Sequence, residues 1–489
     1  MHAEIIDRIT PTITQWEHPF MSGAFTPNYV EYTATGLEVI GEVPRRLNGV
    51  YLRNTQNPVH EPLGVHHAFD GDGMLHLLSF RNGAVEYRNR FLRTKGFQEE
   101  QAAGQALYAG LIDNPKLSRR EGWGARGGLK DTSATDVIVH GGTALTTFYQ
   151  CGEPYRFDAR TLEPLGVSRW GAQVMKDNGI SAHPKVCPRT GDLLFFNYSK
   201  HAPYMHYGEV DSQDRLVHYV PVPLSGPRLP HDMVFTENYA ILDDFPLHWD
   251  ESLLAQGKHK LSYYEHKPSR FAVVPRRHAL QTGVKWFEAS PTYVLHWLNA
   301  WEEGDEVVMH GYHQKSPMPK AGYDNTGGTL GPDRYGPTLY EWRLNMRTGA
   351  ATEKRLSERY LEFGMINVRH WGRPYRYSYS MIAHPRHFLF DGILRFDHAT
   401  GETQEYRFGE GRFGSESPMA PAFDSAGEDD GYVVSFVTDM KADRSECVVL
   451  DARDISRGPV ARIILPHRIS SGTHACWADA SELRGESSV

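Results

Sequence analysis

Residues 394–406 read LRFDHATGETQEY, and this pattern decides the fold class. A strand-like run ends in Asp397, and a turn that contains Gly401 leads into a second run of strand-forming residues. Three more segments have the same order of features: 154–166 (PYRFDARTLEPLG), 339–351 (LYEWRLNMRTGAA) and 447–459 (CVVLDARDISRGP). An Asp or Asn followed by turn residues between two such runs is typical of a hairpin. Four similar outer hairpins spread along the chain favour a β-propeller, in which blades surround a central axis.

The rest of the chain is also rich in short strand-like runs. Examples are DVIVHGG (136–142), DLLFFNY (192–198), DEVVMHGY (305–312) and GYVVSFV (431–437). Breaks rich in Gly, Pro and Asp separate them, with 46 Gly and 30 Pro in the chain, and helical periodicity is scarce. We therefore expect an all-β protein. Since no linker or low-complexity segment divides the sequence, we expect one domain over residues 1–489.

The composition excludes several classes of protein. A formal net charge of -8 argues against nucleic acid as a partner. There is no run of 18 apolar residues, and the first 20 residues lack the pattern of a secretory signal, so we expect a cytoplasmic protein. The four cysteines form no C-x-x-C pair, which indicates reduced thiols and no cysteine metal site.

Histidine is frequent, with 25 residues, and four of them border strand-like runs: His183, His231, His296 and His474. They lie far apart in the sequence, as expected if each blade directs one side chain towards the axis. Neutral imidazole is a suitable ligand for iron, copper, nickel or zinc. Other histidines, such as His66 and His310, are equivalent by residue type, so spacing alone does not select the four.

Longer blocks of sequence resemble the carotenoid cleavage oxygenase family. Two N-terminal blocks, NGVYLRNTQNP (48–58) and HHAFDGDGMLH (66–76), are similar to family signatures. The four histidines lie in further matching blocks: SAHPKVCPRTGDLLFFNY (181–198), PHDMVFTENYAIL (230–242), LHWLNAWEEGD (295–305) and GTHACW (472–477). YLEFGMINVRHWGRPYRYSY (360–379) and ESPMAPAFDSAGEDDGY (416–432) match two more.

This resemblance implies a seven-bladed β-propeller with a dome of loops and helices over an axial iron site. It implies that Fe(2+) is held by His183, His231, His296 and His474, and that two open positions remain for O2. The implied reaction is cleavage of a C=C bond by O2 to give two carbonyl products.

The resemblance also implies roles for residues around the iron. Glu362 and Glu416 match glutamates that accept hydrogen bonds from ligand histidines. The third such glutamate is replaced by Gln150 in QCGEPY, and the family pairing makes His231 its expected partner. Thr135 in DTSATDVIV matches a threonine whose methyl group crowds an open iron position.

The substrate is harder to predict. Stilbenoid-cleaving relatives present a Tyr and a Lys to the substrate phenol, and the matching positions here are Ile112 and Tyr149. We therefore expect a carotenoid or apocarotenoid in an apolar tunnel, with Tyr149 in contact with the substrate and a membrane-facing rim at its mouth. Three alternatives stay open: a stilbenoid or phenylpropene (lignostilbene-type) dioxygenase, a retinoid-isomerase-like enzyme, and a non-catalytic propeller.

Overall fold

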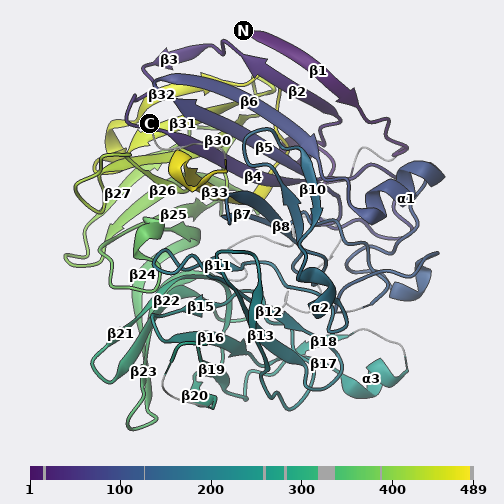
Figure 1. Ribbon diagram of the computed structural model, residues 1–489, viewed down its shortest axis with the longest axis vertical. Coiled ribbons are helices and arrows are strands. Elements are labelled where there is room, and N and C mark those ends of the chain that lie inside the picture. Colours follow the sequence, from purple (N-terminus) through teal and green to yellow (C-terminus); the bar gives the residue numbers. More distant parts are fainter. Residues whose placement is uncertain are drawn as a thin grey trace.

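The computed structural model describes residues 1–14, 18–125, 127–256, 260–279, 283–317, 336–385 and 388–484. Its strands form separate sheets that follow one another around a common centre in chain order (Figure 1). The yellow C-terminal strands lie beside the purple and blue N-terminal ones, so the two ends of the chain meet in the ring. Within these residues the sheets divide into seven blades, numbered here in chain order.

The first three blades are built mainly from the N-terminal half of the chain. From its inner edge outward, blade 1 contains β33 (Gly472–Asp479), β4 (Gly49–Asn57), β5 (Asp72–Arg81), β6 (Ala84–Phe91), β2 (Val30–Thr35) and β1 (His2–Arg8). Blade 2 contains β7 (Asp136–His140), β8 (Thr143–Thr147), β9 (Tyr155–Phe157) and β10 (Pro164–Val167). Blade 3 contains β11 (Lys185–Val186), β12 (Leu193–Tyr198), β13 (Met205–Val210) and β14 (Leu216–Pro221).

Blades 4 and 5 follow. Blade 4 contains β15 (Val234–Phe235), β16 (Tyr239–Asp244), β19 (Ser269–Pro275) and β20 (Lys285–Ala289). A two-stranded sheet of β17 (Leu247–Trp249) and β18 (Leu261–Tyr263) extends between β16 and β19. Blade 5 contains β21 (Tyr293–Glu303), β22 (Glu306–Gln314), β23 (Thr338–Asn345) and the first part of β24 (Ala351–Met365).

The last two blades complete the ring. The end of β24 is the inner strand of blade 6 and pairs with β25 (Tyr377–Ala383), which is followed by β26 (Phe390–Asp397) and β27 (Thr403–Arg407). In blade 7, β29 (Met419–Pro421) and β28 (Arg412–Phe413) pair with β30 (Gly431–Asp439), and β31 (Arg444–Asp451), β32 (Pro459–Ile464) and β3 (Val39–Gly41) follow outward.

Contacts between the innermost strands identify the centre of the ring. Neighbouring inner strands touch at β29 and β33, β33 and β7, β7 and β11, β15 and β21, and β21 and β24. The ring is closed twice by strands distant in sequence, since β33 pairs with β4 in blade 1 and β3 pairs with β32 in blade 7. The seven-bladed propeller implied by the resemblance is thus confirmed.

The apolar cores lie between neighbouring blades. Each of the seven interfaces has its own cluster of buried residues: for example, Val50 and Leu77 of blade 1 pack with Val137 and Phe157 of blade 2. A strand in the middle of such a stack is covered on both faces, which is why β12 (LLFFNY) is mostly apolar and buried along its whole length.

The hairpins that indicated a propeller all connect the third and fourth strands of a blade. Asp397 Oδ1 accepts hydrogen bonds from the backbone N–H groups of Ala399 (2.9 Å) and Thr400 (3.4 Å) in the β26–β27 turn. Asp158, Asn345 and Asp451 accept backbone N–H groups in the same way in the other three turns. The repeated Asp or Asn therefore stabilises the turn locally, which explains why the pattern was visible in the sequence.

Helices are few, and long connections cover part of the blades. Among the residues that the structure describes, the α-helices are α1 (Lys95–Ala103), α2 (Gly171–Met175) and α3 (Glu251–Ala255). The connections 58–71 and 92–135, the latter including α1, are joined by hydrogen bonds from Leu111 N–H to Asp70 (2.8 Å) and from Val65 N–H to Asp113 (2.9 Å). In the described part of the chain, none of the helices has the length and apolar character needed to cross a bilayer.

Candidate metal centre

Four histidines meet where the inner strands converge. His183 lies just before β11 of blade 3, and His231 lies just before β15 of blade 4. His296 is part of β21 in blade 5, and His474 is part of β33 in blade 1. One ring nitrogen of each lies within 4.8 Å of the others, and all four side chains are buried. The structure therefore brings together, from four blades, the histidines that the resemblance selected.

The arrangement of their nitrogens suits a metal ion. His183 Nε2 and His231 Nε2 are 3.2 Å apart. Two ligands with bonds of about 2.1 Å, set at right angles on one ion, would be about 3 Å apart. His296 Nε2 is buried and has no hydrogen-bond partner among the described residues, and a metal ion would satisfy it. The group contains only histidines, a donor set that suits iron, copper, nickel or zinc.

Burial keeps most of these rings neutral. Burial, together with the neighbouring imidazoles and Lys185, lowers the pKa of His183 and His296 well below the ordinary value and that of His231 to about 3. For His474, burial also acts to lower the pKa, but the carboxylates of Glu416, Asp136 and Asp232 outweigh it, so the net shift is upward. Neutral imidazole is the form that binds metals.

Three carboxylates stand behind the histidines. Glu362 Oε2 lies 2.6 Å from His296 Nδ1, and Glu416 Oε2 lies 3.4 Å from His474 Nδ1. A third carboxylate, Asp136 Oδ2, lies 3.1 Å from His183 Nδ1. An ionised carboxylate can only accept, so each Nδ1 donates its proton and each Nε2 lone pair is left for a metal.

Left-handed backbone conformations cluster around the site. His183 has φ +62°, Phe363, directly after Glu362, has φ +48°, and Cys151, directly after Gln150, has φ +68°. Non-glycine residues rarely adopt these angles, at a cost of order 1–3 kcal/mol each. Their concentration here indicates that the surrounding blades hold these side chains in orientations that a relaxed chain would not adopt.

Thr135 and Tyr149 lie next to each other beside the histidines. Thr135 Oγ1 accepts a hydrogen bond from the Tyr149 backbone N–H (3.1 Å), and the Thr135 carbonyl accepts one from the Thr473 hydroxyl (3.2 Å). The hydroxyl of Thr135 is therefore used for structure. The Tyr149 ring lies 5.5 Å from the His231 ring, centroid to centroid, so Tyr149 reaches the immediate neighbourhood of the centre.

Gln150 does not make its expected contact. Its Oε1 atom is buried, yet among the described residues it has no hydrogen-bond partner, and no hydrogen bond joins it to His231. Its carbonyl accepts from the Ala125 N–H (2.6 Å), which fixes the backbone at this point.

Sequence reasoning missed Asp136. The residue directly follows Thr135, and as the first residue of inner strand β7 it could have been recognised as facing the centre. It also missed a buried ion pair nearby, in which Lys185 Nζ lies 2.7 Å from Asp232 Oδ1. Asp136, Lys185, Asp232 and Glu416 line one cavity with His183, His296 and His474.

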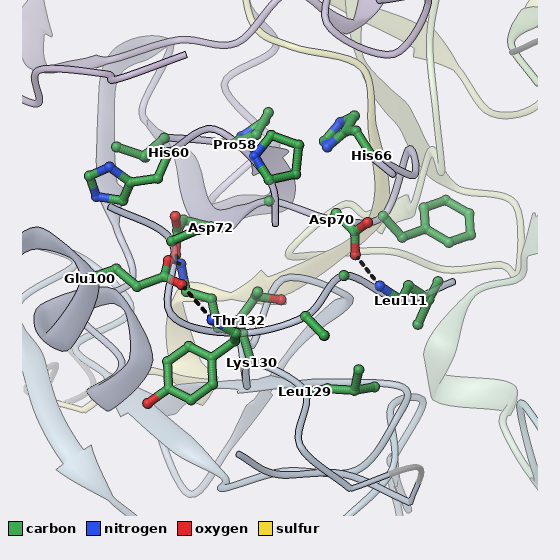
Figure 2. Close-up of a pocket in the computed structure, with 18 of the residues that line it drawn as sticks. Pro58, His60, His66, Asp70, Asp72, Glu100, Leu111, Leu129, Lys130 and Thr132 are labelled. Atoms are coloured by element: carbon green, nitrogen blue, oxygen red, sulfur yellow. Dashed lines mark hydrogen bonds and ion pairs between the residues drawn. The ribbon is translucent and has the colours of Figure 1, made fainter. Parts of the chain in front are cut away.

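On another side of the centre, aromatic rings lead towards the long connections. The Phe363 ring lies 4.6 Å from that of His296, and Phe388 is 6.3 Å from Phe363. Phe69 is 5.8 Å from Phe388 and 6.2 Å from Tyr149. Phe69 also lines a second pocket, formed by the connections 58–71 and 92–135 (Figure 2). A row of aromatic side chains thus extends from the histidines to this pocket.

The pocket in Figure 2 is lined by charged, polar and apolar side chains. Lys130 Nζ lies 2.5 Å from Asp72 and 2.6 Å from Glu100, and these three groups gather on one side. Leu111, held through its N–H by Asp70, lies on the other. The pocket therefore combines an ion-pair cluster with apolar side chains such as Leu111 and Leu129.

Comparison with known proteins identifies the family. The family described as retinal pigment epithelial membrane protein matches residues 25–479, which is most of the chain. The chain belongs to the carotenoid cleavage oxygenase family. Carotenoid 9,10(9',10')-cleavage dioxygenase 1 of Phaseolus vulgaris is 33% identical over 511 residues, covering 96% of this chain and 91% of that relative. Isoeugenol monooxygenase of Pseudomonas nitroreducens is 30% identical, covering 94% of this chain and 98% of the relative.

A solved structure agrees in fold. The lignostilbene dioxygenase of Pseudomonas brassicacearum superimposes with a TM-score of 0.85 at 27% identity, covering 96% of this chain and 100% of that one. This family member is therefore an oxygenase on a β-propeller, and its four histidines form a group that could bind the metal on which the family depends.

Proposed function

We propose that this protein is an Fe(2+)-dependent dioxygenase that cleaves a C=C bond of a carotenoid or apocarotenoid with O2. One observation carries the proposal: four buried histidines converge with Nε2 atoms facing one another, while carboxylates hold Nδ1 of three of them. Relatives with the printed activity of carotenoid cleavage support the substrate class.

His183, His231, His296 and His474 would hold the iron. Ferrous iron, when bound, supplies the electron that O2 needs to react with an alkene, since triplet O2 does not add directly to a singlet C=C bond. Because only four side chains would bind the ion, O2 could also reach it. In the balanced reaction the C=C bond breaks and each carbon receives one oxygen atom, so the products are two carbonyl compounds.

The side chains around the centre orient the ligand histidines and do not themselves react with the substrate. Glu362, Glu416 and Asp136 keep the Nδ1 protons in place. No side chain has to act as a general acid, base or nucleophile, because the reaction transfers no proton. This role agrees with a centre built from metal ligands and from carboxylates that orient them.

The aromatic row defines the proposed substrate path. A polyene entering between the connections 58–71 and 92–135 would pass Phe69 and Phe388 and reach Phe363 beside His296. Planar, conjugated chains pack well against aromatic faces. Ile112, at one of the positions where stilbenoid-cleaving relatives have a polar residue, is 47% exposed, so it offers no buried contact to a phenol.

The mouth of this path has apolar residues on its surface. Val65, Ile112 and Leu117 are each 47% exposed, and all three lie on the two connections that form the pocket. Exposed apolar side chains at the opening of this pocket are suited to contact with a lipid surface, where such substrates dissolve. A peripheral membrane contact is therefore part of the proposal.

A second substrate class is favoured by a specific observation. Tyr149 stands within ring contact of His231, where its polar end could recognise a phenolic substrate. Isoeugenol monooxygenase and lignostilbene dioxygenase are among the similar proteins. Cleavage of a phenylpropene or hydroxystilbene is the alternative.

The experiment that separates the two offers substrates side by side. The iron-loaded protein is incubated in air with carotenoids, apocarotenals, isoeugenol and hydroxystilbenes, and products are identified by mass. We expect paired carbonyl products from an apocarotenoid or carotenoid. Efficient cleavage of hydroxystilbenes alone would replace the substrate class. Conversion without O2 uptake would instead indicate an isomerase, and no conversion of any alkene by iron-loaded protein would indicate a non-catalytic propeller.

A further inference from the structure

We infer that Asp136 is a positioning residue for the ligand His183, and that it supplies the negative charge that blade 2 lacks at Gln150. The inference rests on the proposed function, because it concerns an ion held by the four histidines. It assigns a role to a residue outside the family's glutamate pattern described above.

The contact is direct and well supported. Asp136 Oδ2 lies 3.1 Å from His183 Nδ1, and its other oxygen, Oδ1, accepts the N–H of Val137 at 2.7 Å. The Asp136 carbonyl accepts from the side-chain amide of Asn54 at 3.4 Å. Asp136 is the first residue of β7, which contacts inner strands β33 and β11 on either side. The carboxylate is thus held by the Val137 N–H and the His183 ring, and the backbone beside it is held by Asn54.

The contact makes blade 2 a contributor to the centre, like the other six blades. With Asp136 included, each of the seven blades supplies one side chain to the centre. In blade order these are His474, Asp136, His183, His231, His296, Glu362 and Glu416. Without Asp136, blade 2 would contribute no charge or ligand to the centre.

Gln150 is not an equivalent substitute. It is neutral, its Oε1 is buried, and no hydrogen bond to His231 exists among the described residues. Lys185 and Asp232 do not alter the charge balance, since they pair with each other at 2.7 Å. Three carboxylates, those of Asp136, Glu362 and Glu416, therefore remain beside Nδ1 atoms and form no ion pair with a Lys or Arg among the described residues.

The negative charge of blade 2 therefore lies next to His183 in this protein, whereas the family pattern would place it next to His231. A carboxylate that accepts Nδ1–H makes the imidazole more basic and stabilises the more positive metal. In this protein the more basic ligand would be His183 rather than His231. His183 also has a left-handed backbone, φ +62°, so its ring orientation depends on contacts such as this one.

The test compares wild type with Asp136→Asn and with a matched control, Glu482→Gln. Both carboxylates line the same cavity, but Glu482 accepts a hydrogen bond from the backbone N–H of Asp479 rather than from a histidine. Iron content, Fe(2+) affinity and the reduction potential of the bound iron are measured on each purified protein. Thermal unfolding of the metal-free forms shows whether the fold is kept.

We expect Asp136→Asn to bind Fe(2+) about 10- to 100-fold more weakly and to have a higher reduction potential. Each tenfold change in the ratio of Fe(3+) to Fe(2+) affinity corresponds to about 59 mV. Glu482→Gln should have the same Fe(2+) affinity and the same reduction potential as wild type. Equal affinity and potential in Asp136→Asn and wild type would overturn the inference.

A second variant guards against a loss that is only structural. Asp136→Ala opens space at the cavity wall, where formate can replace the missing carboxylate and formamide can replace only its shape. Recovery of the potential with formate but not with formamide supports the inference, and equal behaviour of the two additives overturns it. If wild type itself takes up no iron, the proposed function fails. If wild type binds iron and Asp136→Asn has the same Fe(2+) affinity and reduction potential, only this inference fails.

Discussion

Glu362→Gln separates the role of a buried carboxylate in metal binding from its role in folding. Glu362 is 3% exposed, and its Oε2 accepts from His296 Nδ1 at 2.6 Å and from the Phe363 N–H at 3.0 Å. Glutamine keeps the shape and one acceptor oxygen but removes the charge that raises the basicity of His296. Changes of this kind cost about 10- to 100-fold in metal affinity, which is roughly 1.4–2.7 kcal/mol.

The effect on the metal-free fold should have the opposite sign. Burial, reinforced by the nearby carboxylates of Asp232 and Glu416, raises the pKa of Glu362 well above its ordinary value. A group whose pKa is raised on folding stabilises the fold fully below its unfolded pKa, and this stability is lost as pH rises through the folded pKa. Near neutral pH the substitution therefore removes a carboxyl group whose raised pKa costs folding stability, so the metal-free variant should be at least as stable as wild type.

The assay is a pair of measurements on the same proteins. Fe(2+) affinity is measured by competition with a chelator, and thermal unfolding of the metal-free form is followed by circular dichroism at pH 5 and pH 8. The control is Glu353→Gln, an exposed glutamate on the same strand, β24. Weaker iron binding without loss of metal-free stability is the predicted result. A variant that binds iron as tightly as wild type, or that loses stability without metal, would refute the reasoning.

Two further predictions follow from contacts near the centre. In Gly364→Ala the new Cβ would overlap the Tyr312 hydroxyl, which is hydrogen-bonded to Ser380, so we expect a loss of about 1–3 kcal/mol in unfolding free energy, measured with urea. An unchanged midpoint and slope would show that the packing is looser than described. Tyr149→Phe should leave apocarotenoid cleavage unchanged and lower any cleavage of hydroxystilbenes about tenfold in kcat/KM. The reverse ranking would assign the phenol of Tyr149 to the polyene reaction.

The outer hairpins could be predicted because their signal is local. Asp158, Asn345, Asp397 and Asp451 each accept backbone N–H groups within a few residues, so a short window of sequence contains the whole interaction. The inner strands lack such a signal. Strands β11 and β15 contain two residues each, too few for any periodicity.

Closure of the ring and the division of β24 are long-range features. β33 pairs with β4, more than 400 residues earlier, and β24 belongs to two blades because the pairing partner changes along its length. No property of the residues 351–365 alone shows where one blade ends. These features depend on which edges remain unpaired once the other blades have formed.

Part of the site could be predicted from the sequence, because some of its residues lie in recognisable segments. His183, His231, His296 and His474 are embedded in long matching blocks, so resemblance selected them although spacing did not. Asp136 lies in the matching segment DTSATDVIV, but the resemblance assigns a role there only to Thr135, and the contact of Asp136 with His183 is visible only in the structure. The expected link between Gln150 and His231 is absent because the amide oxygen, although buried, reaches no donor among the described residues.

The central claim is that one iron ion, held by four histidines, makes this propeller an alkene-cleaving oxygenase. The most direct test titrates Fe(2+) into metal-free protein in air with an apocarotenoid and measures the paired carbonyl products. Product formation should rise in proportion to iron until one ion is bound per chain, and it should stop under nitrogen or when Zn(2+) occupies the site. Undiminished cleavage by the metal-free protein, or by the protein without O2, would contradict the account.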